Sequence, residues 1–361
     1  MKEESIEFET KDVFYNPAMQ FSRSFSSLAV GVIGQKLDIL DAFCASGIRG
    51  IRYKKENKNV SKISFLDLSE HAIKITKTNV HKNKIKNGTF ISNTFARHFA
   101  NEKNEYDFIE IDPFGTPAPY LGDALRFSIK KEMYLSLTAT DTAVLCGPQA
   151  KACLKNYHAK NLNNEFTHET GTRLLIKRVM DIAGENDRGI VPLFSLSNRH
   201  YIKLLLKVEK GAEKAYDNLE HIGYISYCIS CGFRKSGKRI ENNCPICKNL
   251  MDYAGPLWLG PLHEKKFLRQ ISVLNKKRNY THQKEIARTL SFMTNEISFP
   301  PYFYDLHREC KRIKVSRVPK LDIVIKKLCK KGTAVRTHFA ENGIKTDCTI
   351  KEFQKILRTS Q

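Results

Sequence analysis

Four cysteines form the most specific chemical pattern in this sequence. Cys228 and Cys231 make one Cys-x-x-Cys pair, and Cys244 and Cys247 make a second. Two such pairs supply four thiolates, which is the complete tetrahedral ligand set of a structural zinc ion. Because no ligand position is left open for water, the spacing predicts a zinc ion with a structural role. The alternative is four reduced cysteines without a metal.

A second pattern joins a carboxylate to an aromatic ring in the segment Asp112-Pro113-Phe114-Gly115. It resembles the (D/N)PP(Y/F) signature of amino-methyltransferases that act on nucleobases. The exocyclic amine of guanine is a poor nucleophile because its lone pair is delocalised into the ring. A carboxylate can accept its N–H bonds and take the proton, while an aromatic ring stacks on the base, which is worth ~1–3 kcal/mol. The alternative is a strand-ending turn with a core phenylalanine.

A third candidate is the turn from Asp41 to Gly50, which follows an apolar segment and is rich in small residues. Ligands of open parallel sheets bind at the carboxyl ends of strands, where small residues let a cofactor approach the backbone. Asp67, at the end of the next apolar segment, is placed to accept hydrogen bonds from ribose hydroxyls. The turn lacks the GxGxxG spacing of a dinucleotide site, and an ordinary strand–turn–helix is the alternative.

Alternating apolar runs and helix-length segments predict the sheet that positions these residues. Short apolar runs separated by helices imply parallel strands that are covered on both faces. A helix is expected from Glu70 to Lys82 and another from Glu169 to Ile182. The expected parallel strands are Leu37–Ala42, Lys62–Asp67, Thr89–Ser92, Tyr106–Asp112 and Met133–Thr140.

The two following segments, Ile190–Leu196 and Tyr201–Val208, predict an antiparallel hairpin that closes the sheet across Ser197–His200. Five parallel strands and a terminal hairpin give the α/β fold of a class I (Rossmann-like) methyltransferase, with a seven-stranded sheet. We place this domain at residues 1–210. Its loop-like residues 1–35 would grip the substrate, and residues 211–361 would form a smaller α+β C-terminal domain that carries the four-cysteine zinc site.

Composition limits the partners that the chain could bind. Lys and Arg outnumber Asp and Glu by 60 to 38, a formal charge of +22 over 361 residues. Such a surplus predicts attraction to a polyanion, although charge alone does not separate nucleic acid from an anionic membrane, and a lysine-rich set of solvated faces is the plainer explanation. No apolar run approaches the ~20 residues that span a bilayer, and the polar N-terminus is unlike a signal peptide. We expect an intracellular protein, nuclear or cytoplasmic, with no obligate protein partner evident.

Motifs spread along the chain resemble those of the tRNA (guanine-26) N2-dimethyltransferases. The resemblance implies a methyltransferase that uses S-adenosylmethionine, with tRNA as its substrate, and a C-terminal domain that helps to hold the tRNA. The matching segments are Val13–Met19, Ser46–Arg52, Asp112–Pro117, Thr138–Ala143 with Cys146-Gly147, the four cysteines, Gly255–Pro261, Arg336–Phe339 and Gly343–Asp347.

The resemblance also assigns roles to individual residues. Asp112 would be the catalytic acceptor, with Phe114 and Phe14 holding the flipped guanine between them. Flipping is needed because the target amine is inaccessible in folded tRNA. The residues that correspond to cofactor contacts are Arg23, Arg49, Asp67, Asn93 and Thr94.

The chain departs from the family pattern after the third strand, where the usual Asp-Ala pair is replaced by Asn93-Thr94. Two alternative functions stay open at this point, the first allowed by the short Asp112–Gly115 motif and the second by this departure together with the basic surplus. One is methylation of another nucleobase amine, such as adenine in DNA or rRNA. The other is an RNA-binding module without catalytic activity.

Overall fold

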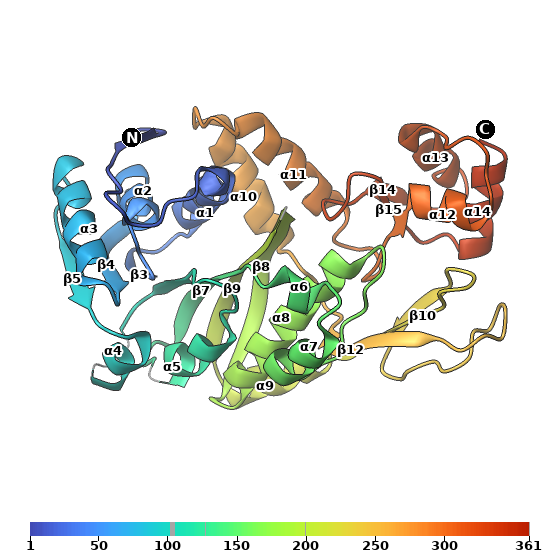
Figure 1. The fold of residues 1–361 in the computed structure, drawn as a ribbon, viewed down its shortest axis with the longest axis horizontal. Coiled ribbons are helices and arrows are strands. Elements are labelled where there is room, and N and C mark those ends of the chain that lie inside the picture. Colours follow the sequence, from blue (N-terminus) through green and yellow to red (C-terminus); the bar gives the residue numbers. More distant parts are fainter. Residues whose placement is uncertain (102–104, 127, 199, 361) are drawn as a thin grey trace.

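A seven-stranded mixed sheet forms the centre of the computed structural model, which describes residues 1–101, 105–126, 128–198 and 200–360 (Figure 1). Apolar residues fill the strands because helices cover the sheet on both faces. In spatial order the strands are β5 (Gly88–Ser92), β4 (Val60–Asp67), β3 (Leu37–Ala42), β6 (Phe108–Ile111), β7 (Glu132–Ala139), β9 (Tyr201–Lys210) and β8 (Arg188–Asn198).

The strand directions confirm the expected sheet. The first five strands run parallel, and β9 lies antiparallel between β7 and β8. Strands β8 and β9 are the expected hairpin; Arg199 in its turn lies outside the described residues. This order places the ends of β3 and β6 side by side, where the strand order reverses and ligands of such sheets bind.

Two buried apolar clusters lie on opposite faces of the sheet, and β3 contributes alternate residues to each. The helices over one face, shown above the sheet in Figure 1, are α1 (Gln20–Val32), α2 (Ile48–Glu56), α3 (Glu70–Lys82), α10 (Lys265–Lys276) and α11 (Gln283–Asn295). The helices on the other side are α4 (Phe95–Asn101), α5 (Leu121–Arg126), α6 (Thr142–Leu145), α7 (Ala150–Tyr157), α8 (Thr167–Gly184) and α9 (Ala212–Leu219).

The expectation that residues 1–35 are loop-like is wrong for much of the segment. Residues 20–32 form helix α1, in which all residues from Phe21 to Val30 are buried. Serines lower the helix propensity of this segment, and burial on every side removes the polar stripe that marks a surface helix. Tertiary packing against α2 and α10 stabilises the helix instead. Ahead of it lie the short strands β1 (Lys2–Glu3) and β2 (Ile6–Glu7) and the 3-10 turn η1 (Pro17–Met19).

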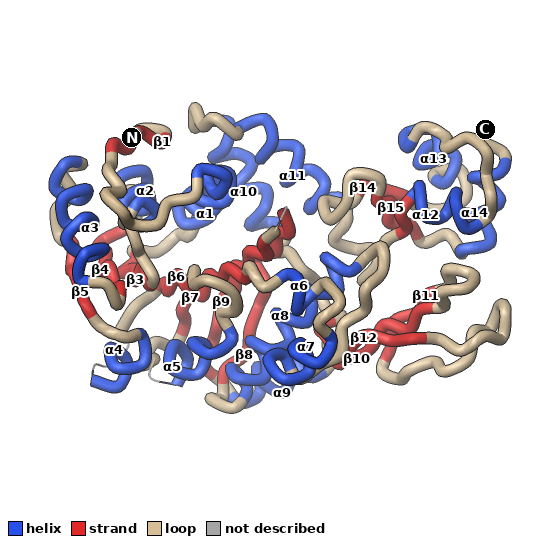
Figure 2. The backbone as a smooth tube through the Cα atoms, viewed as in Figure 1, coloured by secondary structure: helices blue, strands red, loops and turns tan. Residues whose placement is uncertain are grey.

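Residues after 210 add two small antiparallel sheets, which Figure 2 shows at one end of the molecule, away from the large sheet. The first sheet contains the four cysteines at its tip, and the second is packed by three short helices. The remaining elements are β10 (Ile222–Tyr227), β11 (Arg234–Gly237), β12 (Asp252–Trp258), β13 (Tyr304–Asp305), α12 (Leu306–Arg312), α13 (Leu321–Leu328), β14 (Ala334–Arg336), β15 (Gly343–Thr346) and α14 (Ile350–Arg358).

Packing is continuous across residue 210, the boundary predicted from the sequence. Helices α10 and α11 share one apolar cluster with α1 and β3, and Trp258 of β12 belongs to the cluster around α8. The domain division stays a prediction, and the two parts share their cores. Among the described residues, no helix combines the length and apolar character needed to cross a bilayer.

Candidate active site

A cavity of about 590 Å³ opens at the carboxyl ends of the parallel strands. It lies where β3, β4, β5, β6 and β7 end, which is the position expected for the ligand of such a sheet. All eight non-cysteine residues predicted from the sequence line this one cavity: Phe14, Arg23, Arg49, Asp67, Asn93, Thr94, Asp112 and Phe114.

The turn after β3 lets the backbone approach a ligand closely. Gly47 has φ +73° and precedes helix α2. A Cβ atom there would lie 2.7 Å from Thr76 Cγ2, so a larger residue would be both strained and crowded. At the start of the helix, the Gly50 N–H donates to Asp41 Oδ2 at 2.8 Å. Burial raises the pKa of Asp41 to about 7.

Asp67 occupies the end of β4 and is fixed by backbone donors. Its Oδ2 accepts the Ala45 N–H at 3.0 Å, and its Oδ1 accepts the Ser69 N–H at 2.9 Å. Its carbonyl oxygen accepts the Asn93 N–H at 3.1 Å, which brings Asn93 and Thr94 to the same edge of the cavity. Backbone donors therefore fix this carboxylate at the edge of the cavity.

The two predicted arginines, Arg23 and Arg49, differ in how their guanidinium nitrogens are paired. Arg23 is buried, and its Nε and Nη2 both donate to Glu3 of the N-terminal hairpin. Arg49 pairs through Nη2 with Asp112, and its Nε lies 3.8 Å from Glu110. Its remaining nitrogen, Nη1, is buried and has no partner among the described residues. An orphaned guanidinium donor at the cavity wall fits a ligand that carries a carboxylate.

Asp112 follows β6 directly, and its side chain is 24% exposed. Burial alone would raise its pKa, but the charges of Arg49 and Lys203 and the hydroxyl of Thr138 outweigh burial and hold the pKa below its ordinary value. The carboxyl group is therefore ionised at neutral pH. It can accept hydrogen bonds, and it is a weak base.

A buried layer of charged groups supports Asp112 from below. Glu110 lies two residues earlier on the same face of β6 and pairs with the Lys203 ammonium. Its other oxygen accepts the Tyr53 hydroxyl at 2.7 Å. All three side chains are fully or almost fully buried. Sequence reasoning missed this layer, although charged residues inside the apolar runs of β6 and β9 could have signalled it.

Two exposed rings stand at the cavity mouth. Phe114 is 80% exposed and Phe14 is 57% exposed, and the rings meet edge to face with centroids 4.9 Å apart. A base between two parallel rings needs about 7 Å, twice the usual carbon contact distance, so the rings must separate to hold one. Gly115, with φ +84°, allows the turn that presents Phe114, and its N–H donates to Thr140 Oγ1 at 2.9 Å.

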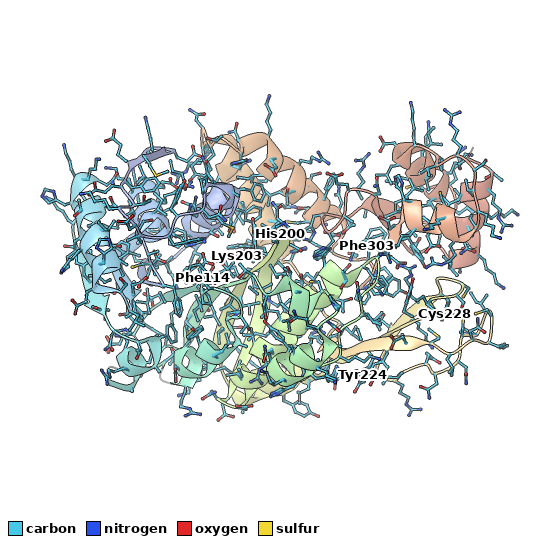
Figure 3. The ribbon with its side chains drawn as sticks, in the orientation of Figure 1. Phe114, His200, Lys203, Tyr224, Cys228 and Phe303 are labelled. Atoms are coloured by element: carbon cyan, nitrogen blue, oxygen red, sulfur yellow. The ribbon has the colours of Figure 1, made fainter. Side chains whose placement is uncertain are left out.

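The four predicted zinc ligands come together at the other end of the molecule, where Figure 3 labels Cys228 far from Phe114. All four sulfur atoms lie within 4.8 Å of one another. Cys228 lies 3.4 Å from Cys247, and Cys231 lies 3.4 Å from Cys244. These separations are much longer than a disulfide and suit four thiolates around one ion.

Comparison with known proteins yields matches over nearly the whole chain. Residues 1–358 match the family described as TRM: N2,N2-dimethylguanosine tRNA methyltransferase. The tRNA (guanine(26)-N(2))-dimethyltransferase of Methanobrevibacter smithii is 36% identical over 356 residues, covering 96% of this chain and 91% of that protein. The tRNA (guanine(26)-N(2)/guanine(27)-N(2))-dimethyltransferase of Aquifex aeolicus is 35% identical over 354 residues, covering 95% and 89%.

A solved structure resembles the entire fold. Trm1 from Pyrococcus horikoshii, in complex with S-adenosyl-L-methionine, superposes with a TM-score of 0.90 at 31% identity and covers 99% of both chains. The likeness includes the segment after residue 210 as well as the large sheet.

Proposed function

This chain belongs to the N2,N2-dimethylguanosine tRNA methyltransferase family, and we propose that it methylates the exocyclic N2 of guanine-26 in tRNA. The first methyl group would give N2-methylguanine, and the second would give N2,N2-dimethylguanine. The observation that carries the proposal is the place of Asp112. Its carboxylate lines the cavity at the strand ends, beside the exposed ring of Phe114. No other predicted residue combines an ionised acceptor with a stacking surface beside it.

We propose that the inner part of the cavity holds S-adenosylmethionine, the molecule with which the similar solved structure forms a complex. When bound, this cofactor supplies an electrophilic methyl group on a sulfonium. Asp67 would accept the ribose hydroxyls, and the free Nη1 of Arg49 would pair with the carboxylate of the methionine part. Arg23 would stand behind that carboxylate, and Asn93 and Thr94 would lie along the adenine.

The outer part of the cavity would receive the flipped guanine. Phe114 and Phe14 would separate and stack on the two faces of the base. Asp112 would accept an N–H of the amine and so fix the direction of its lone pair. The proton passes to this carboxylate once the nitrogen has gained its methyl group, because a cationic amine of this kind is a strong acid and a weak base can take its proton.

The four-cysteine cluster would hold one structural zinc ion. The donors are four thiols, and all coordination positions are occupied by protein. Each pair begins a tight turn: the Gly232 N–H donates to the Cys228 carbonyl at 2.9 Å, and the Lys248 N–H donates to the Cys244 carbonyl at 3.0 Å. Zinc would fix the tip of the β10–β12 sheet in the C-terminal part, which we propose helps to hold the tRNA.

Reaction with an unmodified tRNA transcript, followed by nucleoside mass spectrometry, tests the function. We expect N2-methylguanosine and N2,N2-dimethylguanosine from a transcript with guanine at position 26. A transcript with adenine at that position is the matched control, and we expect no methylated product from it. Absence of any methylguanine from the guanine-26 transcript at low salt would refute the proposal.

A further inference from the structure

Three polar residues form one row across three adjacent strands of the sheet. In the ladder between β7 and β9, Thr138 lies opposite Lys203. The last pair of the β6–β7 ladder is Ile111 with Leu137, so the next residues, Asp112 and Thr138, are neighbours as well. Because side chains alternate between faces along a strand, residues of one row share a face. The row therefore leads from the cavity into the buried interior.

The chemistry of the three groups fixes the direction of their hydrogen bonds. The Lys203 ammonium lies 3.2 Å from Thr138 Oγ1 and has only hydrogens to offer. Thr138 therefore accepts from Lys203, and its single hydroxyl hydrogen is left for the Asp112 carboxylate, its neighbour in the row, whose pKa the hydroxyl lowers. Glu110 of β6, two strands away from β9, pairs with the Lys203 ammonium. Lys203 therefore donates to Thr138, and Thr138 is left to donate to the Asp112 carboxylate.

We propose that Thr138 and Lys203 are positioning residues of the methyl transfer, in which Lys203 orients the Thr138 hydroxyl and that hydroxyl orients the Asp112 carboxylate toward the amine. This inference rests on the proposed function. The final torsion of an aspartate side chain is broad, so the carboxylate plane is set by its hydrogen-bond donors. Arg49 supplies one donor from helix α2, and the Thr138 hydroxyl faces the carboxylate from the adjacent position of β7.

Both residues are suited to this role by burial. Thr138 and Lys203 are almost inaccessible to solvent, so water cannot replace the bond that either one makes. The row also explains why a lysine lies within the apolar strand β9.

Substitution of Thr138 tests the inference directly. Thr138→Val keeps the shape of the side chain and removes the hydroxyl, whereas Thr138→Ser keeps the hydroxyl. Lys203→Met is a poorer test because it leaves Glu110 buried without its partner and is expected to destabilise the fold. The matched control is Thr172→Val, because Thr172 is equally buried and its hydroxyl donates to a carbonyl of its own helix.

We expect Thr138→Val to lower kcat by about tenfold, the usual effect of one hydrogen bond to a charged group, with KM for tRNA and for S-adenosylmethionine unchanged. Thr138→Ser should restore most of kcat, and Thr172→Val should leave it at the wild-type value. Nucleoside mass spectrometry gives the rates, and thermal unfolding of each variant accompanies them.

The inference is overturned if Thr138→Val keeps wild-type kcat. It is equally overturned if Thr138→Ser is as slow as Thr138→Val, or if the loss in Thr138→Val lies in KM, because a packing defect would produce either result. If the wild-type enzyme makes no methylguanine, both the proposed function and this inference are wrong. If the wild type is active and Thr138→Val has the same kcat, only the inference is wrong.

Discussion

The Asp112 carboxylate is held ionised, and in this state it is better suited to orient the guanine amine than to abstract a proton from it. Arg49, Lys203 and Thr138 keep its carboxylate ionised, which makes it a reliable acceptor and a weak base. Guanine N2 does not need to lose a proton before it attacks, because the proton becomes acidic as the nitrogen–carbon bond forms. The surroundings of this one residue therefore favour a mechanism in which the lone pair is aimed first and the proton leaves afterwards.

At the same scale, the exposed ring of Phe114 should contribute to recognition of the base. We expect Phe114→Ala to lower kcat/KM for tRNA by roughly 5- to 150-fold, since stacking of one base is worth ~1–3 kcal/mol. Phe114→Tyr should retain most of the activity because the ring remains.

Leu68 provides the control for Phe114. It lines the same cavity, is 70% exposed and lacks a ring. Initial rates at several tRNA concentrations compare the variants, and equal effects of Phe114→Ala and Leu68→Ala would contradict a stacking role.

The elements of the fold differ in how well the sequence predicts them. Strands buried on both faces appear as apolar runs, and β3 is predicted at the bounds observed, Leu37–Ala42. Helix α1 could not be predicted in this way, because its four serines lower helix propensity and its burial leaves no polar stripe. Its stability comes from α2 and α10, and α10 lies more than two hundred residues away along the chain.

The residues of the candidate site also differ in how well the sequence predicts them. Asp112, Asp67 and the turn after β3 could be predicted because the ends of parallel strands meet at one edge of the sheet. The charged residues of the buried layer beneath them are visible in the apolar runs, but their pairing could not be predicted, because the partners are distant in sequence. Glu110 and Lys203 are separated by 93 residues, and only the antiparallel placement of β9 beside β7 brings them together.

The cysteine-bearing sheet β10–β12 yields the prediction at the scale of an element. Elemental analysis should find one zinc ion per chain. Cys244→Ser should lose the ion and lower the melting temperature, because metal binding at such a site contributes to folding. Cys329→Ser is the matched control, since Cys329 is exposed and lies outside the cluster. A Cys244→Ser variant with full zinc content and unchanged melting would contradict the zinc assignment.

At the scale of the whole molecule, shared apolar clusters and a buried ionic network join the residues before and after residue 210. Lys345 of β15 donates to Glu169 of α8 at 2.6 Å, and it lies 4.0 Å from Glu296 at the end of α11. Arg173 of α8 donates to the carbonyl of Trp258 at 3.0 Å. These contacts connect the large sheet with the C-terminal part, so the surface that would hold tRNA is fixed relative to the cavity.

Glu296 makes the stability of this junction sensitive to acid. Burial opposes its ionisation, but His338 and Lys345 outweigh burial and lower its pKa to about 2, from an ordinary value of about 4.3. A depressed pKa gives stability that is complete above the ordinary value and is lost as the pH falls toward 2. We expect Glu296→Gln to lower the free energy of unfolding at pH 7 by about 3 kcal/mol, as when one partner of a buried ion pair is removed.

Urea unfolding at pH 7 and at pH 3 measures this effect. The difference between wild type and Glu296→Gln should shrink at the lower pH, because part of the wild-type contribution is already lost there. Glu341→Gln, at an exposed position, should match wild type at both values. A constant difference between Glu296→Gln and wild type at the two values would contradict the assignment.

The most direct measurement of the central claim is the rate of N2-methylguanosine formation by Asp112→Asn on the guanine-26 transcript. The substitution preserves shape and removes the charge that accepts the proton. The account predicts a loss of at least about 10²-fold in kcat with tRNA binding retained. Turnover close to that of wild type, with the same nucleoside product, would contradict it.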